Sequence, residues 1–260
     1  MTDTAGQIEF NKSLVIFAAH PDDTEIFCAG TLKLLRNKGW KITVCTMTAG
    51  GMGGIGSDET TTIKLRKNEA AQAAALLDAE YYCLDGRDGY LYDTEEMRVK
   101  AQDVIRRAKA GVVIGHLIND YHADHRAAAS ITDAAAMLAT LPNVPSQYPP
   151  LSVTPLFYHS ATLGLTDPLG NRMPDPHFYV NITSAEDFKM KMLECHQSQI
   201  NLMRIMHKMD DFFGAMKQQD IAWGEEAGVP FAEAYWQHLG GGFQKRPLLQ
   251  EELAEFIIKK

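Results

Sequence analysis

The sequence predicts an α/β protein with a doubly wound, mostly parallel, Rossmann-like sheet, and two observations support this fold class. First, short apolar segments rich in Val, Ile, Cys and aromatic residues alternate with longer helical patterns through the first 140 residues. Such alternation joins parallel strands through crossover helices. Second, further strand-like segments follow a proline-rich stretch, so we expect the C-terminal part to form a strand and helix cap on the same sheet.

The elements of the first half follow in order along the chain. The expected strands are residues 14–19, 42–48, 81–84 and 112–116. The expected helices are residues 22–37, 58–77, 95–108 and 125–138. Gly39 after the first helix and Asp58 before the second are typical stop and start residues, which supports these limits.

The second half begins with an irregular excursion at residues 141–155, where five of fifteen residues are proline. Beyond it we expect strands at residues 156–160 and 178–182, and one long helix over residues 184–217. At 260 residues the chain has the length of one large domain. We interpret residues 1–260 as such a domain, with core β/α units at 12–140 and its completion at 156–260.

Composition limits the partners and the compartment. The net charge of −8 and the sequence pI near 5.6 argue against nucleic acid or an anionic membrane surface as a partner. The apolar run at residues 14–19 is too short for a signal-peptide core or a membrane span. The four cysteines are far apart, as in a cytoplasmic protein with reduced thiols: Cys28, Cys45, Cys83 and Cys195. A metal would therefore be held by His and carboxylate side chains.

Ligands of doubly wound sheets bind beyond the carboxyl ends of the strands. The first expected strand ends in His-Pro-Asp-Asp, residues 20–23, which we call the HPDD turn. Asp and Pro are also common at helix N-termini, so helix capping is the alternative interpretation. A second cluster, DYHADHRAAA at residues 120–129, follows the fourth expected strand. Because both clusters fall at the same sheet edge, capping alone does not explain them.

Together the clusters predict a metal site. Catalytic zinc takes three ligands from His and carboxylate and keeps a position for water. His20 and Asp23 lie three positions apart across a tight turn, and His125 can supply the third ligand. Asp22 would then lie beside the metal without binding it, where a general base is needed.

These residues also resemble those of a known family, the LmbE/PIG-L superfamily of zinc-dependent de-N-acetylases. The specific part of the resemblance is AHPDDTE at 19–25 and HADH at 122–125, which we call the HADH motif. Shorter or weaker matches are CAGTL at 28–32, RKNE at 66–69, KMLECHQSQ at 191–199 and VPFAEAY at 229–235. The chain departs from the family's pattern at Phe27, Ala29 and Ala123, none of which is an expected ligand.

The resemblance implies zinc held by His20, Asp23 and His125, with Asp22 as general base. It further implies that His122 faces the tetrahedral intermediate and is oriented by Asp124. The implied reaction is hydrolysis of an N-acetyl group, usually on a glucosamine unit of a small-molecule substrate. Fe²⁺ or another divalent metal remains an alternative to zinc, because these ions share such ligands. Family relatives are commonly oligomeric, so the resemblance also implies a homo-oligomer.

Two residues have less defined roles. The family suggests that Arg66 reaches toward substrate, whereas the alternative is an Arg66–Glu69 pair on a helix surface. Asp88 follows the third expected strand and could bind sugar hydroxyls or serve only in a turn. His196 and Glu233 are more simply interpreted as packed or surface residues.

The segment GMGGIG at residues 51–56, the glycine loop, leaves a competing interpretation open. It fits the dinucleotide fingerprint G-x-G-x-x-G, which would predict a nicotinamide- or flavin-dependent oxidoreductase. However, it follows the second expected strand instead of the first, and Asp58 and Glu59 would repel a pyrophosphate. A flexible loop near the metal is the preferred interpretation. A non-catalytic, sugar-binding relative braced by metal is the third hypothesis.

Overall fold

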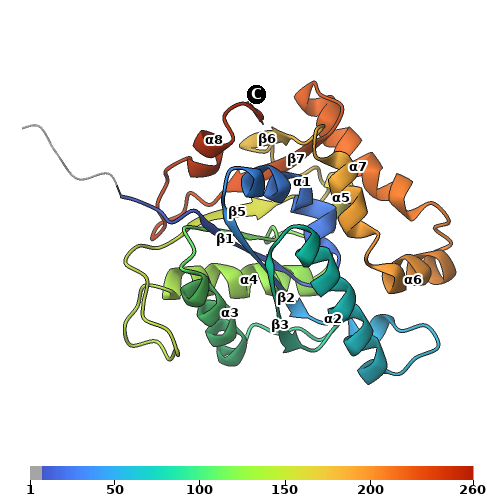
Figure 1. Ribbon diagram of the computed structural model, residues 1–260, viewed down its shortest axis with the longest axis horizontal. Coiled ribbons are helices and arrows are strands. Elements are labelled where there is room, and N and C mark those ends of the chain that lie inside the picture. The colour runs from blue at the N-terminus through green and yellow to red at the C-terminus, as the bar shows by residue number, and fades with distance from the viewer. Residues whose placement is uncertain (1–7, 260) are drawn as a thin grey trace, which may run out of the picture.

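The computed structural model describes residues 8–259, which form one eight-stranded sheet (Figure 1). The strands are β1 (Ser13–Ala18), β2 (Lys41–Thr48), β3 (Glu80–Gly86), β4 (Val112–Gly115), β5 (Leu156–Ser160), β6 (Phe178–Asn181), β7 (Ala232–Gln237) and β8 (Ile257–Ile258). Their order across the sheet is β3-β2-β1-β4-β5-β7-β6-β8. The first five in this order are parallel, and the last three run antiparallel to their neighbours. The predicted mostly parallel α/β fold with a C-terminal cap on the same sheet is confirmed.

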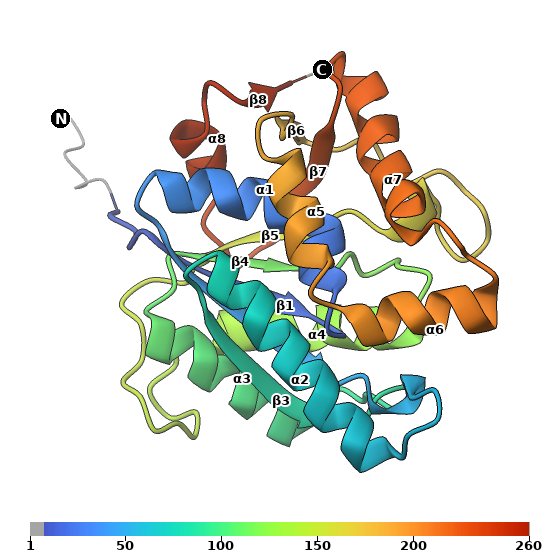
Figure 2. The same cartoon turned by 45° about the vertical axis from the view of Figure 1, so that its right-hand side comes forward.

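Helices cover both faces of this sheet (Figure 2). They are α1 (Asp23–Asn37), α2 (Glu59–Leu76), α3 (Glu95–Ala108), α4 (Ala123–Leu138), α5 (Glu186–Leu193), α6 (Gln197–His207), α7 (Phe212–Ala227) and α8 (Leu248–Glu252). Successive side chains of a strand point to opposite faces, and β1 is apolar on both. Leu14 and Ile16 join the core beneath α1 and α2, whereas Val15 and Phe17 join the core beneath α3 and α4.

The C-terminal half differs from its prediction in its helices and its strands, and α8 and β8, like β7, were not predicted. The expected helix over residues 184–217 is three helices, α5 to α7, because the chain breaks at His196 and again at Lys208. Lys208 has a left-handed φ of 56°, which ends α6, and His196 is fully buried. Strand β7 was not predicted, since the charged Glu233 interrupts its apolar pattern although the whole strand is buried.

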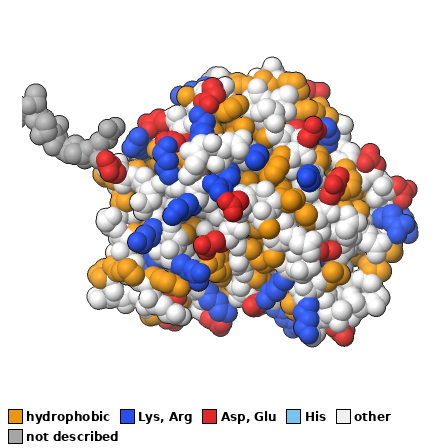
Figure 3. All heavy atoms as spheres, in the orientation of Figure 1, with side chains coloured by type: hydrophobic (Ala, Val, Ile, Leu, Met, Phe, Trp, Pro, Cys, Tyr) orange, Lys and Arg blue, Asp and Glu red, His pale blue; other side chains and the backbone are white. Residues whose placement is uncertain are grey.

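No helix between residues 8 and 259 is both long and apolar enough to cross a bilayer. Acidic and basic side chains are interspersed on the face shown in Figure 3.

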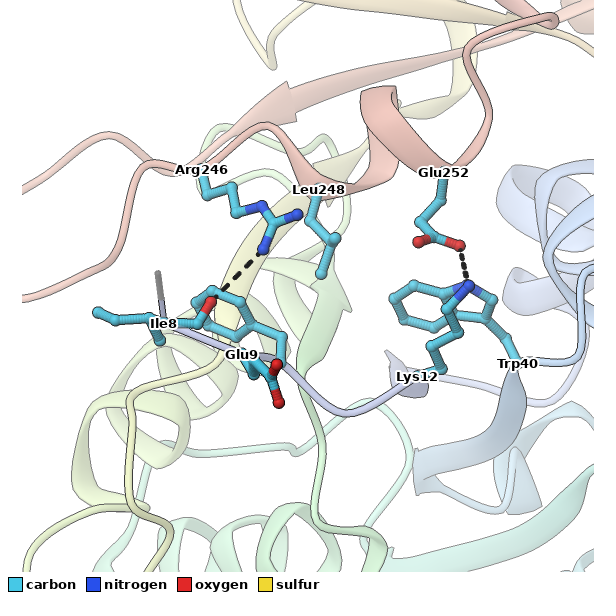
Figure 4. Close-up of a pocket in the computed structure, with 8 residues that line it drawn as sticks. Ile8, Glu9, Lys12, Trp40, Arg246, Leu248 and Glu252 are labelled. Atoms are coloured by element: carbon cyan, nitrogen blue, oxygen red, sulfur yellow. Dashed lines mark hydrogen bonds and ion pairs between the residues drawn. The ribbon is translucent and has the colours of Figure 1, made fainter. Parts of the chain in front are cut away.

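A hollow of about 310 Å³ is lined by Lys12 and Trp40, which precede β1 and β2 (Figure 4). It therefore lies at the amino ends of these strands, away from their carboxyl ends. Its polar groups pair with one another: Lys12 and the indole of Trp40 both contact the carboxylate of Glu252. Arg246 donates to the carbonyl of Ile8. The hollow brings together no His and carboxylate cluster, so we place the functional site elsewhere on chemical grounds.

Gly30, in the middle of α1, is expected to resist substitution by alanine. A Cβ at this position would lie 2.7 Å from Cγ2 of Ile182, which is fully buried between α1 and β6. We expect Gly30→Ala to lower the free energy of unfolding by about 1–3 kcal/mol, the usual range for overpacking. Urea unfolding measures the change, and Ile182→Ala is the matched partner because it removes Cγ2 and Cδ1, two of the three crowded side-chain atoms, and leaves only Cβ. If the double variant is as unstable as the sum of the single ones, the steric explanation is wrong.

Candidate active site

The HPDD turn is held in a strained conformation at the carboxyl edge of the sheet. Asp22 has a φ of 103°, which few residues other than glycine adopt, and it forms the N-cap of α1. The N–H of Ala19 donates to Nε2 of His116 at 2.9 Å. The carbonyl of Ala19 accepts from both the N–H and the hydroxyl of Thr48 at 2.9 Å. Asp23 accepts the N–H of His20 at 2.8 Å. These bonds stabilise the strained turn and direct its side chains.

The HADH motif begins α4 at the same edge. His122 is the N-cap of this helix, and its Nδ1 accepts the N–H of Asp124 at 3.2 Å. Asp120 accepts the N–H of His122 at 2.8 Å. Another contact of Asp120 joins its Oδ1 to Nδ1 of His125 at 3.0 Å. The cap and the carboxylate of Asp120 together set the position of His125 one turn into the helix.

Asp23 joins the two motifs. Its Oδ1 lies 3.3 Å from Nε2 of His125, and its Oδ2 lies 3.5 Å from Nδ1 of His20. Asp23 and His125 are buried, at 6% and 2% exposure. Ligand atoms of Asp23, His116 and His125 lie within 4.8 Å of one another, as do those of His20, His122 and His125. The structure thus connects His20, Asp23 and His125 through two groups that share His125, and these groups add His116 and His122.

The donor set of this cluster fits a divalent cation. Burial alone lowers the pKa of His125, but the carboxylates of Asp23 and Asp120 raise it to about 9. A positive charge is therefore favoured at this point of the protein interior. Oδ2 of Asp120 is buried and has no hydrogen-bond partner among the described residues. This buried group of His and Asp side chains could bind a metal ion, with the His and carboxylate ligands that catalytic zinc uses.

Asp22 lies beside the cluster and is almost completely buried, at 5% exposure. Burial raises its pKa to about 6, although the guanidinium of Arg66, 3.8 Å away, lowers the pKa in part. A carboxylate with a raised pKa is a suitable proton acceptor near neutral pH. The role of Asp22 as a general base beside a metal stays a prediction.

Asp124 contacts a different partner from the expected one. Its carboxylate accepts the N–H groups of Gly89 and Leu91 at 2.7 and 3.3 Å and lies 3.2 Å from Nε2 of His20. The contact between Asp124 and His122 is made instead by the backbone N–H of Asp124. Asp124 therefore orients His20 directly and His122 through the start of α4.

Arg66 and Glu69 form no ion pair on the helix surface, so that alternative interpretation is wrong. Both are buried, at 4% and 6% exposure. Arg66 donates to the carbonyls of Gly50 and Pro21, at 3.1 and 2.9 Å. Glu69 accepts the N–H and hydroxyl of Ser198 at the start of α6. Arg66 therefore connects α2 to the HPDD turn, and Glu69 connects it to α6.

Asp88 connects the cluster to the glycine loop. Its Oδ1 lies 3.3 Å from Nε2 of His20, and its Oδ2 accepts the N–H of Met52 at 2.9 Å. An N–H group that already binds a carboxylate is not free for a pyrophosphate, which further weakens the dinucleotide interpretation. The loop includes the short 3₁₀-helix η1 (Gly51–Gly53) and precedes α2.

Sequence reasoning gave no role to two residues of the cluster, His116 and Asp120. Asp120 lies in the second sequence cluster, residues 120–129, but its 0% exposure could not be foreseen. The sequence offered one signal for His116: it is the last residue of an expected strand, and strand ends form the ligand-binding edge of the sheet. His196, interpreted as packed, is buried with Nε2 3.2 Å from the Glu25 carboxylate.

Two comparisons with known proteins concern the family of this chain. The family model PIG-L, described as GlcNAc-PI de-N-acetylase, matches residues 15–136. Diacetylchitobiose deacetylase of Thermococcus kodakarensis is 27% identical over 200 residues, covering 72% of this chain and 70% of that protein. The crystal structure of a conserved protein from Thermus thermophilus is 30% identical, with a TM-score of 0.69, and covers 88% of this chain and 95% of that one.

A third comparison concerns the fold alone. The structure of 4-carboxy-2-hydroxymuconate hydratase from Pseudomonas putida is 20% identical, covers 90% of this chain and 98% of that one, and has a TM-score of 0.70. The fold thus serves a hydratase as well as deacetylases, and function must be argued from the site.

The fold and the site together define a class: α/β proteins with a His and Asp cluster at the carboxyl ends of a parallel sheet. Both cluster-forming motifs fall within the residues that the family model matches. The chain belongs to the PIG-L (LmbE) family of de-N-acetylases.

Proposed function

We propose that this protein is a metal-dependent hydrolase that removes the acetyl group from an N-acetylglucosamine-type sugar. The observation that carries the proposal is the buried Asp22 carboxylate beside the Asp23–His125 pair. Two curated relatives support the substrate class: a diacetylchitobiose deacetylase and a probable N-acetyl-α-D-glucosaminyl L-malate deacetylase. The exposed ring of Tyr121, edge-on to His122 and His125, offers an aromatic face for a sugar at the mouth of the site.

The proposed ligands are His20, Asp23 and His125. Zinc, or Fe²⁺ in its place, would polarise the acetyl carbonyl and lower the pKa of a water molecule toward 7. Asp22 would act as general base, accepting the proton of the attacking water and delivering it toward the leaving amine. His122, on the open side of the cluster, stabilises the charge that develops on the acetyl oxygen.

The remaining site residues position these groups. Asp124 orients His20, and Asp88 connects His20 to the glycine loop and could bind a sugar hydroxyl. The proposed setting is the cytoplasm, in keeping with four free thiols. Self-association is proposed from the family resemblance alone.

Acetate release tests the proposed function. Zinc-loaded protein is incubated with a panel that includes N-acetylglucosamine, diacetylchitobiose and an N-acetylglucosaminyl malate, and acetate is measured directly. Release that requires the metal and stops when a chelator removes it would support the proposal. A protein that holds zinc and releases acetate from none of these substrates would contradict it and favour a non-catalytic sugar-binding role.

Arg66→Lys is expected to lower kcat/KM about 10- to 100-fold. The guanidinium binds the carbonyls of Gly50 and Pro21 at the same time, whereas the single ammonium of lysine cannot reach both. The HPDD turn then shifts, and small misplacements of catalytic groups have effects of this size. Steady-state kinetics measure the change. The neighbouring Lys67→Met is the control, because Lys67 contacts Asp85 and makes no bond to the turn. Equal kinetics of the two variants would contradict the positioning role of Arg66.

A further inference from the structure

His116 is buried at the back of the candidate metal site. It follows β4 directly and is 2% exposed. Its ring stacks on that of His125, with centroids 4.1 Å apart and planes inclined by 20°. Phe27 packs edge-on against both rings, with centroids 6.0 and 6.2 Å away. His116 therefore supports one face of the His125 imidazole.

The hydrogen bond of His116 determines which role it can have. Its Nε2 accepts the N–H of Ala19 at 2.9 Å, so the lone pair on Nε2 is already used. A neutral imidazole with an acceptor at Nε2 carries its proton on Nδ1. Neither nitrogen then offers a lone pair to a metal, although Nε2 lies only 3.5 Å from Oδ2 of Asp23. His116 is near the ligands without being free to act as one.

The hydrogen bond from Ala19 to His116 connects the ends of β1 and β4 beyond the point where their backbone pairing stops. Strands β1 and β4 are paired from Leu14–Val112 to Ile16–Ile114, and the pairing stops there. Beyond that point, the side chain of His116 joins the two chain segments at Ala19, immediately before His20. His116 is in turn anchored through its carbonyl, which accepts Nδ1 of His159 at 2.9 Å.

We propose that His116 is a positioning residue of the metal centre, which holds the HPDD turn against the end of β4 and supports the ring of His125. This inference rests on the proposed function, since it takes His20, Asp23 and His125 as the ligands. By fixing both Ala19 and His125, His116 sets the separation between the two motifs. Residues that orient metal ligands in this way commonly change metal affinity about 10- to 100-fold when they are replaced.

Zinc affinity, measured by competition with a chromophoric chelator, tests the proposal in three variants. We expect His116→Leu to weaken zinc binding about 10- to 100-fold. His116→Gln places an amide oxygen where Nε2 was and should recover most of that loss. His196→Leu is the matched control, because it removes a similarly buried histidine that contacts Glu25 and none of the proposed ligands. Thermal unfolding of each metal-free variant shows whether it is folded.

Several results would overturn the proposal. They are unchanged affinity in His116→Leu, no recovery in folded His116→Gln, and an equal loss in His196→Leu. If His116→Leu does not fold, His116→Gln tests the proposal instead. This variant should bind zinc nearly as tightly as the wild type. The visible spectrum of the Co²⁺-loaded protein should be unchanged by His116→Leu at saturating metal. An altered spectrum would show that His116 is itself a ligand.

The outcomes also separate this inference from the proposed function. A wild-type protein that binds zinc but releases no acetate overturns the proposed function and leaves the comparison of affinities valid. A wild-type protein that binds no zinc overturns both. Acetate release together with unchanged zinc affinity in His116→Leu overturns only the role of His116.

Discussion

Asp22→Asn is expected to reduce the rate of acetate release about 100- to 10,000-fold, the usual contribution of a general base, while zinc stays bound. Asparagine has nearly the same shape as aspartate but cannot accept a proton. Asp22 is not among the residues whose ligand atoms group together, so its replacement should leave the metal in place. The left-handed conformation of residue 22 tolerates asparagine well, and the turn should persist.

Measurement of zinc content and kcat in the same preparation checks this prediction. Asp23→Asn gives the contrasting result, because Asp23 contacts both His20 and His125, and the expected loss is of the metal itself. Asp58→Asn is the control, because it makes the same substitution at an exposed carboxylate, the N-cap of α2. It should retain activity, since asparagine also caps a helix. An Asp22→Asn protein with full activity would exclude Asp22 as the base, and one without zinc would make it a ligand.

Lys189→Met is expected to lower the free energy of unfolding by about 3–5 kcal/mol, the range for breaking a buried ion pair. The ammonium of Lys189 is 1% exposed and donates to Asp220 at 2.7 Å and to Glu233 at 3.0 Å. Burial alone lowers the pKa of Lys189, but the two carboxylates raise it above the ordinary value, so the side chain stays charged. Removal of this cation leaves two buried carboxylates without their partner.

The loss of the Lys189 ammonium should also affect α1, the helix that follows the HPDD turn. The carboxylate of Glu233 also accepts the N–H groups of Gly30 and Thr31, at 3.0 and 2.9 Å. Lys189 on α5 thus helps to fix a residue of β7 that holds α1 in place. Loss of stability should therefore be accompanied by weaker metal binding.

Guanidinium chloride unfolding measures the effect of Lys189→Met. Lys191→Met, on an exposed face of the same helix, is the matched control and should change stability by less than about 0.5 kcal/mol. Adding Asp220→Asn to Lys189→Met should restore part of the loss, because one buried charge is then removed. If Lys189→Met resembles its control, the network contributes little to stability.

The α/β alternation was predictable because its signals are local. The apolar runs of β1, β2 and β4 and the periodic patterns of α1, α3 and α4 depend on neighbouring residues only. The cap beyond β5 was less predictable. The burial of Glu233 depends on Lys189 and Asp220, which come from other helices, so a charged residue within β7 could not be recognised as part of a central strand.

The sequence by itself determined the fold class and the two motifs, and the sheet-edge rule was enough to bring His20, Asp23 and His125 together. Only the tertiary structure decided how these residues are held. In the folded chain the ring of His116 stacks on that of His125, and the carboxylate of Asp124 contacts His20. Arg66 and Glu69 bind different partners, Gly50 and Ser198, and do not pair with each other. The contact of Asp124 with His20 spans 104 positions of the chain, and no local pattern specifies which partner a buried polar group will find.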